Sequence, residues 1–378
     1  MLKFASRLSN VDISGIRRMF NLPKDKNLIN LALGELNFGI PPKSKDAISQ
    51  GLVENFTHYT PNKGIPELRT ALVEKIKEPG VDYNDEEIII TSGASEALHL
   101  AILTIVDKGN EVLIPDPGFV SYSPLVNIAS GKPVPYRLKE ENSFYPEIKI
   151  LKELINKKTK MIIINSPSNP TGAVFPKSIL KEIADISEDQ NITILSDEVY
   201  NEITYERNHQ SIAKYSSNAI MVNSFSKSYA MTGLRLGYTY TERKIIEEML
   251  KIHQYIQAST CSLSQISALA ALRSKDFVDF ILTELLERRN LAYTLLKKIP
   301  GVECSIPQGA FYLFPNFSKF GKSETLAMRI YKEAKVVTTP GNAFGKEGEG
   351  YLRLSYGTDK DKIKLGINRI RKCLVGAN

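Results

Sequence analysis

The chain has 378 residues, of which 42% are hydrophobic and 24% are charged, and these proportions exclude a disordered or collagen-like protein. At roughly 150 residues per domain, this length predicts one large domain and a smaller one. The 49 Lys and Arg residues exceed the 42 Asp and Glu residues by seven. Because the basic residues are spread along the chain without forming a stripe, we expect no nucleic-acid partner.

The three cysteines lack both CxxC and metal-ligand spacing, which predicts free thiols in a reducing compartment. The chain has no HExxH motif and no EF-hand loop, so we expect no metal site. No run of 18 apolar residues occurs, and the first residues lack the apolar core of a signal peptide. We therefore expect a cytoplasmic protein with no membrane segment.

The first 40 residues contain a short helical pattern and the apolar run LINLALG, and we expect this segment to pack with the C-terminal part of the chain. From about residue 86, apolar runs alternate with amphipathic, helix-like stretches. These runs are 87–91, 111–114, 161–165, 192–195, 219–223 and 234–240. Their Ile, Val and Leu content is typical of strands covered on both faces, which predicts an α/β fold with a mainly parallel sheet flanked by helices. Ligands are then expected at the carboxyl ends of the strands.

After residue 242 the pattern changes to long helical stretches, 242–273 and 276–298, followed by GAFYLFP, another helix and the alternating strand GYLRLSYG. This order is typical of a smaller α+β domain. We therefore divide the chain into an N-terminal segment, 1–40, a large domain, 41–275, and a small domain, 276–378.

The first candidate site is the motif TSGASEALHLAIL, which places Gly93, Ala94 and Ser95 between a strand and a helix. Backbone N–H groups at a helix N-terminus bind phosphate, although a simple serine N-cap explains the same pattern. A third interpretation is a degenerate nucleophile elbow, because Asp197 and His209 follow Ser95 in the order of a serine hydrolase. Against it, the last elbow position is alanine and no HGGG-type sequence is present.

Two polar motifs follow buried strands. INSPSNPTG places Asn169 in a turn held by prolines and a glycine, which suits either a structural turn or an amide directed into the crevice. ITILSDEVYNEI places Asp197 at the end of a strand, with Tyr200 three residues later. A carboxylate at this position either caps the next turn or meets a cation in the cleft.

Two further motifs supply cations. NSFSKSYAMTGLRLGY places Lys227 among serines after a strand, where a desolvated amine can acquire the lowered pKa that Schiff-base chemistry needs, and it places Arg235 where a phosphate could bind. A solvated surface lysine is the ordinary alternative. In GYLRLSYG, the period of two puts Arg353 opposite a core face, which suits either carboxylate recognition or a surface position on an edge strand.

Together these motifs resemble those of the fold-type I, class I and II aminotransferases, which depend on pyridoxal 5'-phosphate. The resemblance covers essentially the whole chain, and within the family it is strongest to the archaeal aromatic and aspartate aminotransferases. It is carried by LALGELNF, HYTPNKG, SGASEAL, PDPGFVSY, NSPSNPTG, SDEVY, SFSKSYAMTGLRLG, PQGAFYLFP, TTPGNAFG and YLRLSYG.

The resemblance implies that the large domain binds the cofactor and that Lys227 holds it as a Schiff base and then moves the substrate proton. Asp197 would keep the pyridine nitrogen protonated, and Tyr200 would contact the ring hydroxyl together with Asn169. Phe119 would stack on the ring. The expected phosphate ligands are Gly93, Ala94, Ser95, Ser224, Ser226 and Arg235, with Tyr59 from a second subunit.

The resemblance also implies a homodimer with shared active sites, in which Arg353 binds the substrate carboxylate beside Gly34 and Asn169. The expected reaction transfers an amino group from an amino acid, aromatic or aspartate, to a 2-oxo acid such as 2-oxoglutarate. Two departures matter: Leu36 and Asn37 replace the frequent PD of GEPDF, and no arginine that would bind a side-chain carboxylate can be identified. A carbon–sulfur β-lyase on the same fold is the alternative enzyme, and a catalytically silent cofactor-binding regulator is an alternative from another functional class.

Overall fold

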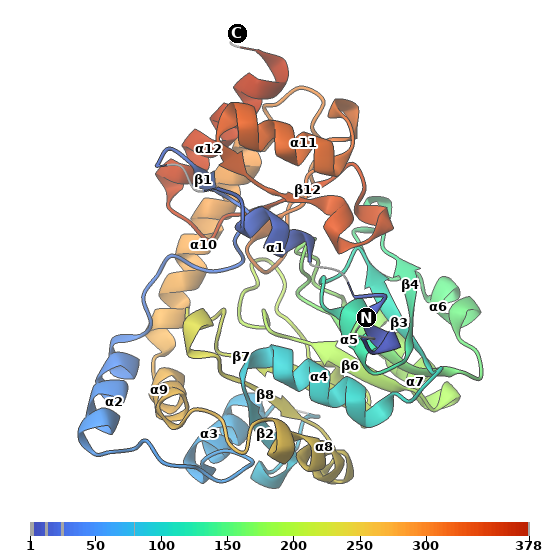
Figure 1. Ribbon diagram of the computed structural model, residues 1–378, viewed down its shortest axis with the longest axis vertical. Helices are drawn as coiled ribbons and strands as arrows, with labels where there is room; N and C mark the ends of the chain where they lie inside the picture. Colours follow the sequence, from blue (N-terminus) through green and yellow to red (C-terminus); the bar gives the residue numbers. More distant parts are fainter. Residues whose placement is uncertain (1–3, 12–13, 24–25, 79, 377–378) are drawn as a thin grey trace.

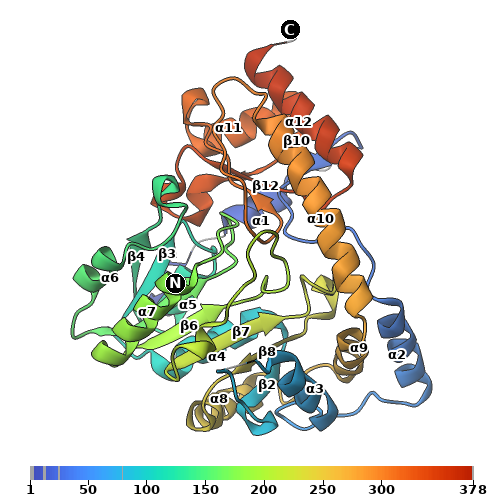
Figure 2. The same cartoon turned by 180° about the vertical axis from the view of Figure 1, so that it is seen from behind.

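The computed structural model describes residues 4–11, 14–23, 26–78 and 80–376, and a central sheet dominates this part of the chain (Figures 1 and 2). Within these residues the sheet has seven strands in the order β2-β8-β7-β6-β5-β3-β4. The strands are β2 (Ile88–Thr91), β3 (Glu111–Asp116), β4 (Lys132–Arg137), β5 (Thr159–Asn165), β6 (Thr193–Asp197), β7 (Ala219–Ser224) and β8 (Gly237–Tyr240). Strand β8 runs antiparallel to both of its neighbours, β2 and β7, and the other neighbouring strands of this sheet pair in parallel. The prediction of a mainly parallel α/β sheet is therefore confirmed.

Helices cover both faces of this sheet, as the apolar runs require. The helices of this region are α3 (Pro66–Ile76), α4 (Gly93–Ile105), α5 (Tyr122–Ile128), α6 (Ile148–Leu154), α7 (Lys177–Gln190) and α8 (Arg243–Ile256). Along β5, Met161 and Ile163 pack with α4, α5 and α8, whereas Ile162 and Ile164 pack with α3, α6 and α7. This alternation explains why the strand has no polar face.

The sequence patterns misjudged two details. The edge strand β4, KPVPYR, was not predicted, because its two prolines and partial exposure remove the apolar signal; an edge position is where a strand tolerates proline. The stretch 242–273 is not one continuous helix, because α8 ends at Ile256 and α9 (Ser262–Leu272) begins after a break. Helix α9 packs beside α2 (Pro42–Val53).

The C-terminal part forms a second packing unit. In the described chain it holds a three-stranded antiparallel sheet, with β12 (Leu352–Ser355) between β9 (Tyr312–Leu313) and β11 (Thr339–Pro340). Around it lie α10 (Lys275–Leu296), α11 (Ser323–Arg329) and α12 (Lys360–Val375). Arg353 therefore lies on a central strand, and the alternative of an edge-strand surface position is wrong.

The N-terminal segment contacts both units. Residues Ser6–Leu8 pack with α5 of the first unit, whereas α1 (Gly15–Phe20) and β1 (Ile29–Asn30) lie against the second unit (Figure 1). Strand β1 pairs in parallel with β10 (Val336–Val337), and Leu31 belongs to the same apolar cluster as α10 and α12. The boundaries of the three predicted parts stay a prediction. Cys261, Cys304 and Cys373 are all free thiols, and none of the described helices is both long and apolar enough to cross a bilayer.

Candidate active site

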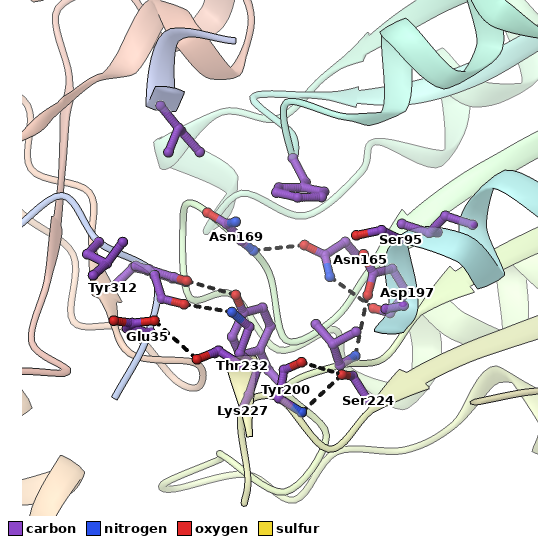
Figure 3. A pocket seen from close by; sticks show the side chains of 18 of the residues that line it. Glu35, Ser95, Asn165, Asn169, Asp197, Tyr200, Ser224, Lys227, Thr232 and Tyr312 are labelled. Atoms are coloured by element: carbon purple, nitrogen blue, oxygen red, sulfur yellow. Dashed lines mark hydrogen bonds between the residues drawn. The ribbon is translucent and has the colours of Figure 1, made fainter. Parts of the chain in front are cut away.

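A cavity of about 300 Å³ opens where β5, β6 and β7 end, which is the edge of the sheet at which ligands are expected (Figure 3). Asn165, Asp197 and Ser224 are the last residues of these three strands, and all three line the cavity. The remaining walls come from the N-terminal turn of α4, the segments after β1 and β7, and strands β9 and β12.

The structure brings most of the predicted site residues to this cavity. Those that line it are Gly34, Ala94, Ser95, Phe119, Asn169, Asp197, Tyr200, Ser224, Ser226, Lys227, Arg235 and Arg353. Gly93 does not line the cavity itself, but it lies beside the Arg235 guanidinium. Tyr59 is outside the cavity, with 89% of its surface exposed.

One end of the cavity is suited to an anion. Gly93 begins α4 with a φ of +71°, and a Cβ on it would lie 2.5 Å from Nη2 of Arg235. Ser92 precedes the helix, but its side chain accepts no capping hydrogen bond, so the simple N-cap interpretation does not hold there. Across from the helix, the backbone N–H of Ser226 donates to Oγ of Ser224 (3.0 Å). A helix start without a side-chain cap, a guanidinium and two serine hydroxyls are together suited to binding a phosphate.

A buried carboxylate lies in the middle of the cavity. Asp197 is 3% exposed, and the phenol of Tyr122 donates a hydrogen bond to its Oδ2 (2.7 Å). Burial raises the pKa of Asp197 to about 6, and the hydrogen bond from Tyr122 opposes part of that shift. The side-chain amide of Asn165 donates to the backbone carbonyl of Asp197 (2.9 Å) and accepts from the backbone N–H of Asn169 (2.8 Å), which links the two predicted motifs (Figure 3). A carboxylate buried in this way is suited to a cationic partner in the cavity.

The amine of Lys227 lies opposite, and its Nζ donates to the backbone carbonyl of Gly34 (2.6 Å). Burial lowers the pKa of Lys227 to about 8, and the charges of Arg353 and Arg235 lower it further. A larger fraction of this amine is therefore neutral near pH 7 than for a solvated lysine, as attack on an aldehyde requires. The alternative of a solvated surface lysine is wrong.

Arg353, a buried cation, lies at another wall of the cavity. It is 1% exposed, and its guanidinium donates to Oδ1 of Asn169 (2.8 Å) and to the carbonyl of Ala32 (2.6 Å). Its Nε is buried and has no hydrogen-bond partner among the described residues, and no carboxylate of that part of the chain pairs with it. A buried cation without a counter-ion favours an anionic ligand.

Sequence reasoning missed four residues that line this cavity, Glu35, Asn165, Thr232 and Tyr312. It also missed Tyr122, which does not line the cavity but donates to Asp197. Tyr122 and Tyr312 lie in motifs that the resemblance includes, PDPGFVSY and PQGAFYLFP. Nothing in either motif indicates a contact, because their partners Asp197 and Tyr200 lie 75 and 112 residues away along the chain.

The serine-hydrolase interpretation is wrong, because its histidine, His209, does not line the cavity that Ser95 and Asp197 line. Nε2 of His209 lies 3.2 Å from Oε2 of Glu198, and both residues line a separate cavity with Ser211. Ser95 lines the cavity that contains Lys227.

Comparisons with known proteins agree with this geometry. The sequence model of the family described as aminotransferase class I and II matches residues 26–370. The aspartate aminotransferase of Pyrococcus horikoshii is 45% identical over 98% of this chain and 97% of that protein. The aromatic-amino-acid aminotransferase 2 of Thermococcus litoralis is 38% identical over 99% of this chain and 98% of that protein. Among solved structures, the aromatic aminotransferase of Pyrococcus horikoshii superimposes with a TM-score of 0.89 at 38% identity, covering 94% of this chain and 98% of that one.

Proposed function

This chain belongs to the class I and II aminotransferases, which depend on pyridoxal phosphate, and we propose that it transfers the amino group of an aromatic amino acid or of aspartate to 2-oxoglutarate. The two donors are those named for the relatives that it resembles. The observation that carries the proposal is one cavity that combines a lysine of lowered pKa, a buried carboxylate and an arginine without a counter-ion.

The residues present fit the cofactor. The start of α4, with Arg235 and the two serines, matches a phosphate, and Asp197 matches a protonated ring nitrogen. When bound, the cofactor supplies an aldehyde for the amino group and a ring that stabilises negative charge at the substrate α-carbon. We assign Phe119 to the ring face and Tyr200, with Asn169, to the ring hydroxyl.

Lys227 is the group that moves the proton. Its Nζ lies between the Gly34 carbonyl and the aromatic rings of Tyr200 and Phe311, each with its centroid 5.8 Å away. In this setting the amine can release its proton near pH 7 and take one from a substrate α-carbon.

Arg353 orients the substrate. Two of its N–H groups are held by Asn169 and Ala32, so the guanidinium plane is set before a ligand arrives. We assign it, with Asn169 and the backbone of Gly34, to the α-carboxylate.

We further propose a cytoplasmic homodimer with shared sites. Tyr59 is exposed and does not line its own cavity, which agrees with a role in the site of a second subunit.

Absorption spectroscopy tests the proposed reaction. The purified protein with pyridoxal phosphate is mixed separately with glutamate, aspartate, phenylalanine and tyrosine, and the rates at which the visible band bleaches rank the donors. The Lys227→Ala variant is the control, and it should retain some cofactor but transfer no amino group. Normal turnover by that variant would contradict the role of Lys227. Pyruvate release from a cysteine conjugate without any 2-oxo acid would favour a β-lyase instead.

A further inference from the structure

Tyr312 contacts both Tyr200, which is assigned to the cofactor, and Arg353, which is assigned to the substrate. Its hydroxyl lies 2.8 Å from the hydroxyl of Tyr200, and the guanidinium carbon of Arg353 lies 4.3 Å from the centre of its ring. The side chain is 1% exposed, and it lines the cavity together with these two residues. Figure 3 labels Tyr312 and Tyr200.

Strand pairing and a glycine define the position of Tyr312, and a second ring lies on the guanidinium that Tyr312 contacts. Strand β9 places it opposite Ser355 of β12, so that its ring and the Arg353 side chain are diagonal neighbours on the sheet. The ring of Phe344 lies 5.0 Å from the same guanidinium. Gly34 allows the close approach of the phenol, because a Cβ on Gly34 would lie 2.5 Å from the Tyr312 hydroxyl.

The direction of the hydrogen bond follows from the charges around the two phenols. Burial raises the pKa of Tyr312, and the Arg353 guanidinium opposes that shift. Burial raises the pKa of Tyr200 well above its ordinary value, and the neighbouring Tyr312 raises it further. Either hydroxyl could donate on distance alone. We assign Tyr312 as the donor to the oxygen of Tyr200, because the Arg353 guanidinium lies 4.3 Å from the centre of the Tyr312 ring and its positive charge makes that phenol the better donor. The O–H of Tyr200 is then free to donate into the cavity.

We propose that Tyr312 is a positioning residue: its hydroxyl directs the Tyr200 proton toward the bound cofactor, and its ring supports Arg353 against the substrate carboxylate. One side chain would thereby link carboxylate binding to the hydrogen bonding of the cofactor. The inference rests on the proposed roles of Tyr200 and Arg353.

Two substitutions separate the two contacts. Tyr312→Phe removes the hydroxyl and keeps the ring, whereas Tyr312→Leu removes both. Tyr205→Phe is a matched control, because Tyr205 also pairs with a second tyrosine, Tyr356 (3.1 Å), and also lies under a guanidinium, that of Arg289 (4.4 Å), but it does not line the cavity.

Two measurements on the holoenzyme read the contacts independently of turnover. The first is the pKa at which the visible absorption band titrates. The second is the dissociation constant of 3-phenylpropanoate, a carboxylate that has no amino group to react.

Tyr312→Phe should raise the pKa of the band by about half a unit to one unit, since a weaker donor at Tyr200 stabilises the anionic ring oxygen less. The dissociation constant should stay within about twofold. Tyr312→Leu should give the same shift and also weaken 3-phenylpropanoate about five- to tenfold, because the stacking on Arg353 is lost. Tyr205→Phe should change neither quantity.

A double-mutant cycle with Tyr200→Phe tests whether the Tyr312 hydroxyl acts on the cofactor through Tyr200. Tyr200→Phe should shift the band, and adding Tyr312→Phe to it should shift the band no further. If Tyr200→Phe shifts the band but Tyr312→Phe does not, or if the two shifts add, the inference about Tyr312 is overturned while the proposed function stands. If Tyr200→Phe itself leaves the band unchanged, the proposed role of Tyr200 fails, and the inference fails with it.

Discussion

The buried carboxylate of Asp197 lowers the stability of the cofactor-free protein, and we expect the bound cofactor to reverse this loss. Its pKa in the folded chain is about 6, above its ordinary value of 3.8, so between these values the folded state binds more protons than the unfolded state. The free energy of unfolding of the cofactor-free protein therefore falls as the pH rises from about 4 to 6. Asp197→Asn removes this loss, and the variant should be more stable than the wild type near pH 7 by about 1–3 kcal/mol. Urea denaturation of both cofactor-free proteins across this pH range measures the difference.

The same comparison with saturating pyridoxal phosphate is the control. A protonated ring nitrogen neutralises the carboxylate, so the cofactor should stabilise the wild type more than Asp197→Asn. Equal stability of the two cofactor-free proteins near pH 7 would show that the buried carboxylate imposes no such cost.

Arg353 should act on the substrate far more than on the cofactor. Removing a buried, charge-assisted contact to a carboxylate costs roughly 2–4 kcal/mol, so Arg353→Ala should lower kcat/KM for phenylalanine about 30- to 1,000-fold. Arg353→Lys should have a kcat/KM for phenylalanine between those of the wild type and Arg353→Ala, because an ammonium keeps the charge but cannot form the paired contact. The check is kcat/KM for phenylalanine and for phenethylamine, which has no carboxylate, alongside the dissociation constant of the cofactor. Equal wild-type rates with the two substrates would contradict the assignment.

At the level of single residues, the sequence indicates which side chains can take part in chemistry, but it does not indicate which side chains contact one another. Lys227, Asp197 and Arg353 could be chosen because each is an ionisable residue at the end of a strand or on an alternating strand. Tyr122 and Tyr312 could not, because a tyrosine beside an aromatic motif is most often part of a core. Their contacts are with residues far away along the chain, and such contacts have no local signal.

At the level of elements, the apolar runs predicted the strands that are buried on both faces and failed where burial is partial. Strand β4 is half-exposed at the edge of the sheet, and its sequence KPVPYR has no apolar period. Strand β1 has only two residues, and it exists through its pairing with β10, more than 300 residues later. Pairing of this kind depends on the tertiary fold, so no local pattern could have predicted it.

The N-terminus of α4 offers a test of the phosphate site. Gly93→Ala would place a methyl group 2.5 Å from Nη2 of Arg235, so it should displace the guanidinium and weaken cofactor binding about tenfold or more. Gly109→Ala is the matched control, because Gly109 also has a positive φ, +82°, but nothing lies within 4 Å of its added Cβ. Both variants should lose about 1–2 kcal/mol of stability from backbone strain, and only Gly93→Ala should lose cofactor affinity. Cofactor titration followed by fluorescence, together with thermal unfolding, measures both effects. Equal cofactor affinities of the two variants would remove Gly93 and Arg235 from the phosphate site.

At the level of the whole molecule, the cavity is lined by residues of both packing units. Figure 2 shows these units one above the other, with the C-terminal unit at the top. The seven-stranded sheet supplies the proposed cofactor residues, Asp197 and Ser224 among them, whereas Arg353 and Tyr312 come from the C-terminal sheet. Gly34 follows β1, which is itself held by β10. A substrate bound as proposed would therefore contact both units at once, which makes their relative position part of its recognition.

The proposed dimer can be tested through Tyr59, whose exposed ring is assigned to the partner's phosphate. Tyr59→Ala should weaken cofactor binding about tenfold or more, so this variant should be nearly inactive at limiting cofactor. Lys227→Ala should be inactive at any cofactor concentration. In a mixed dimer, the Lys227→Ala chain supplies Tyr59 to the site that retains Lys227, so one of its two sites is intact. Random reassociation of equal amounts makes half of the dimers mixed, and about a quarter of all sites should then regain full activity. The assay is transamination at limiting cofactor, before and after unfolding and refolding the two variants together. Activity no greater than the sum of the separate variants would mean that each site is built from one chain, because shared sites must produce this recovery.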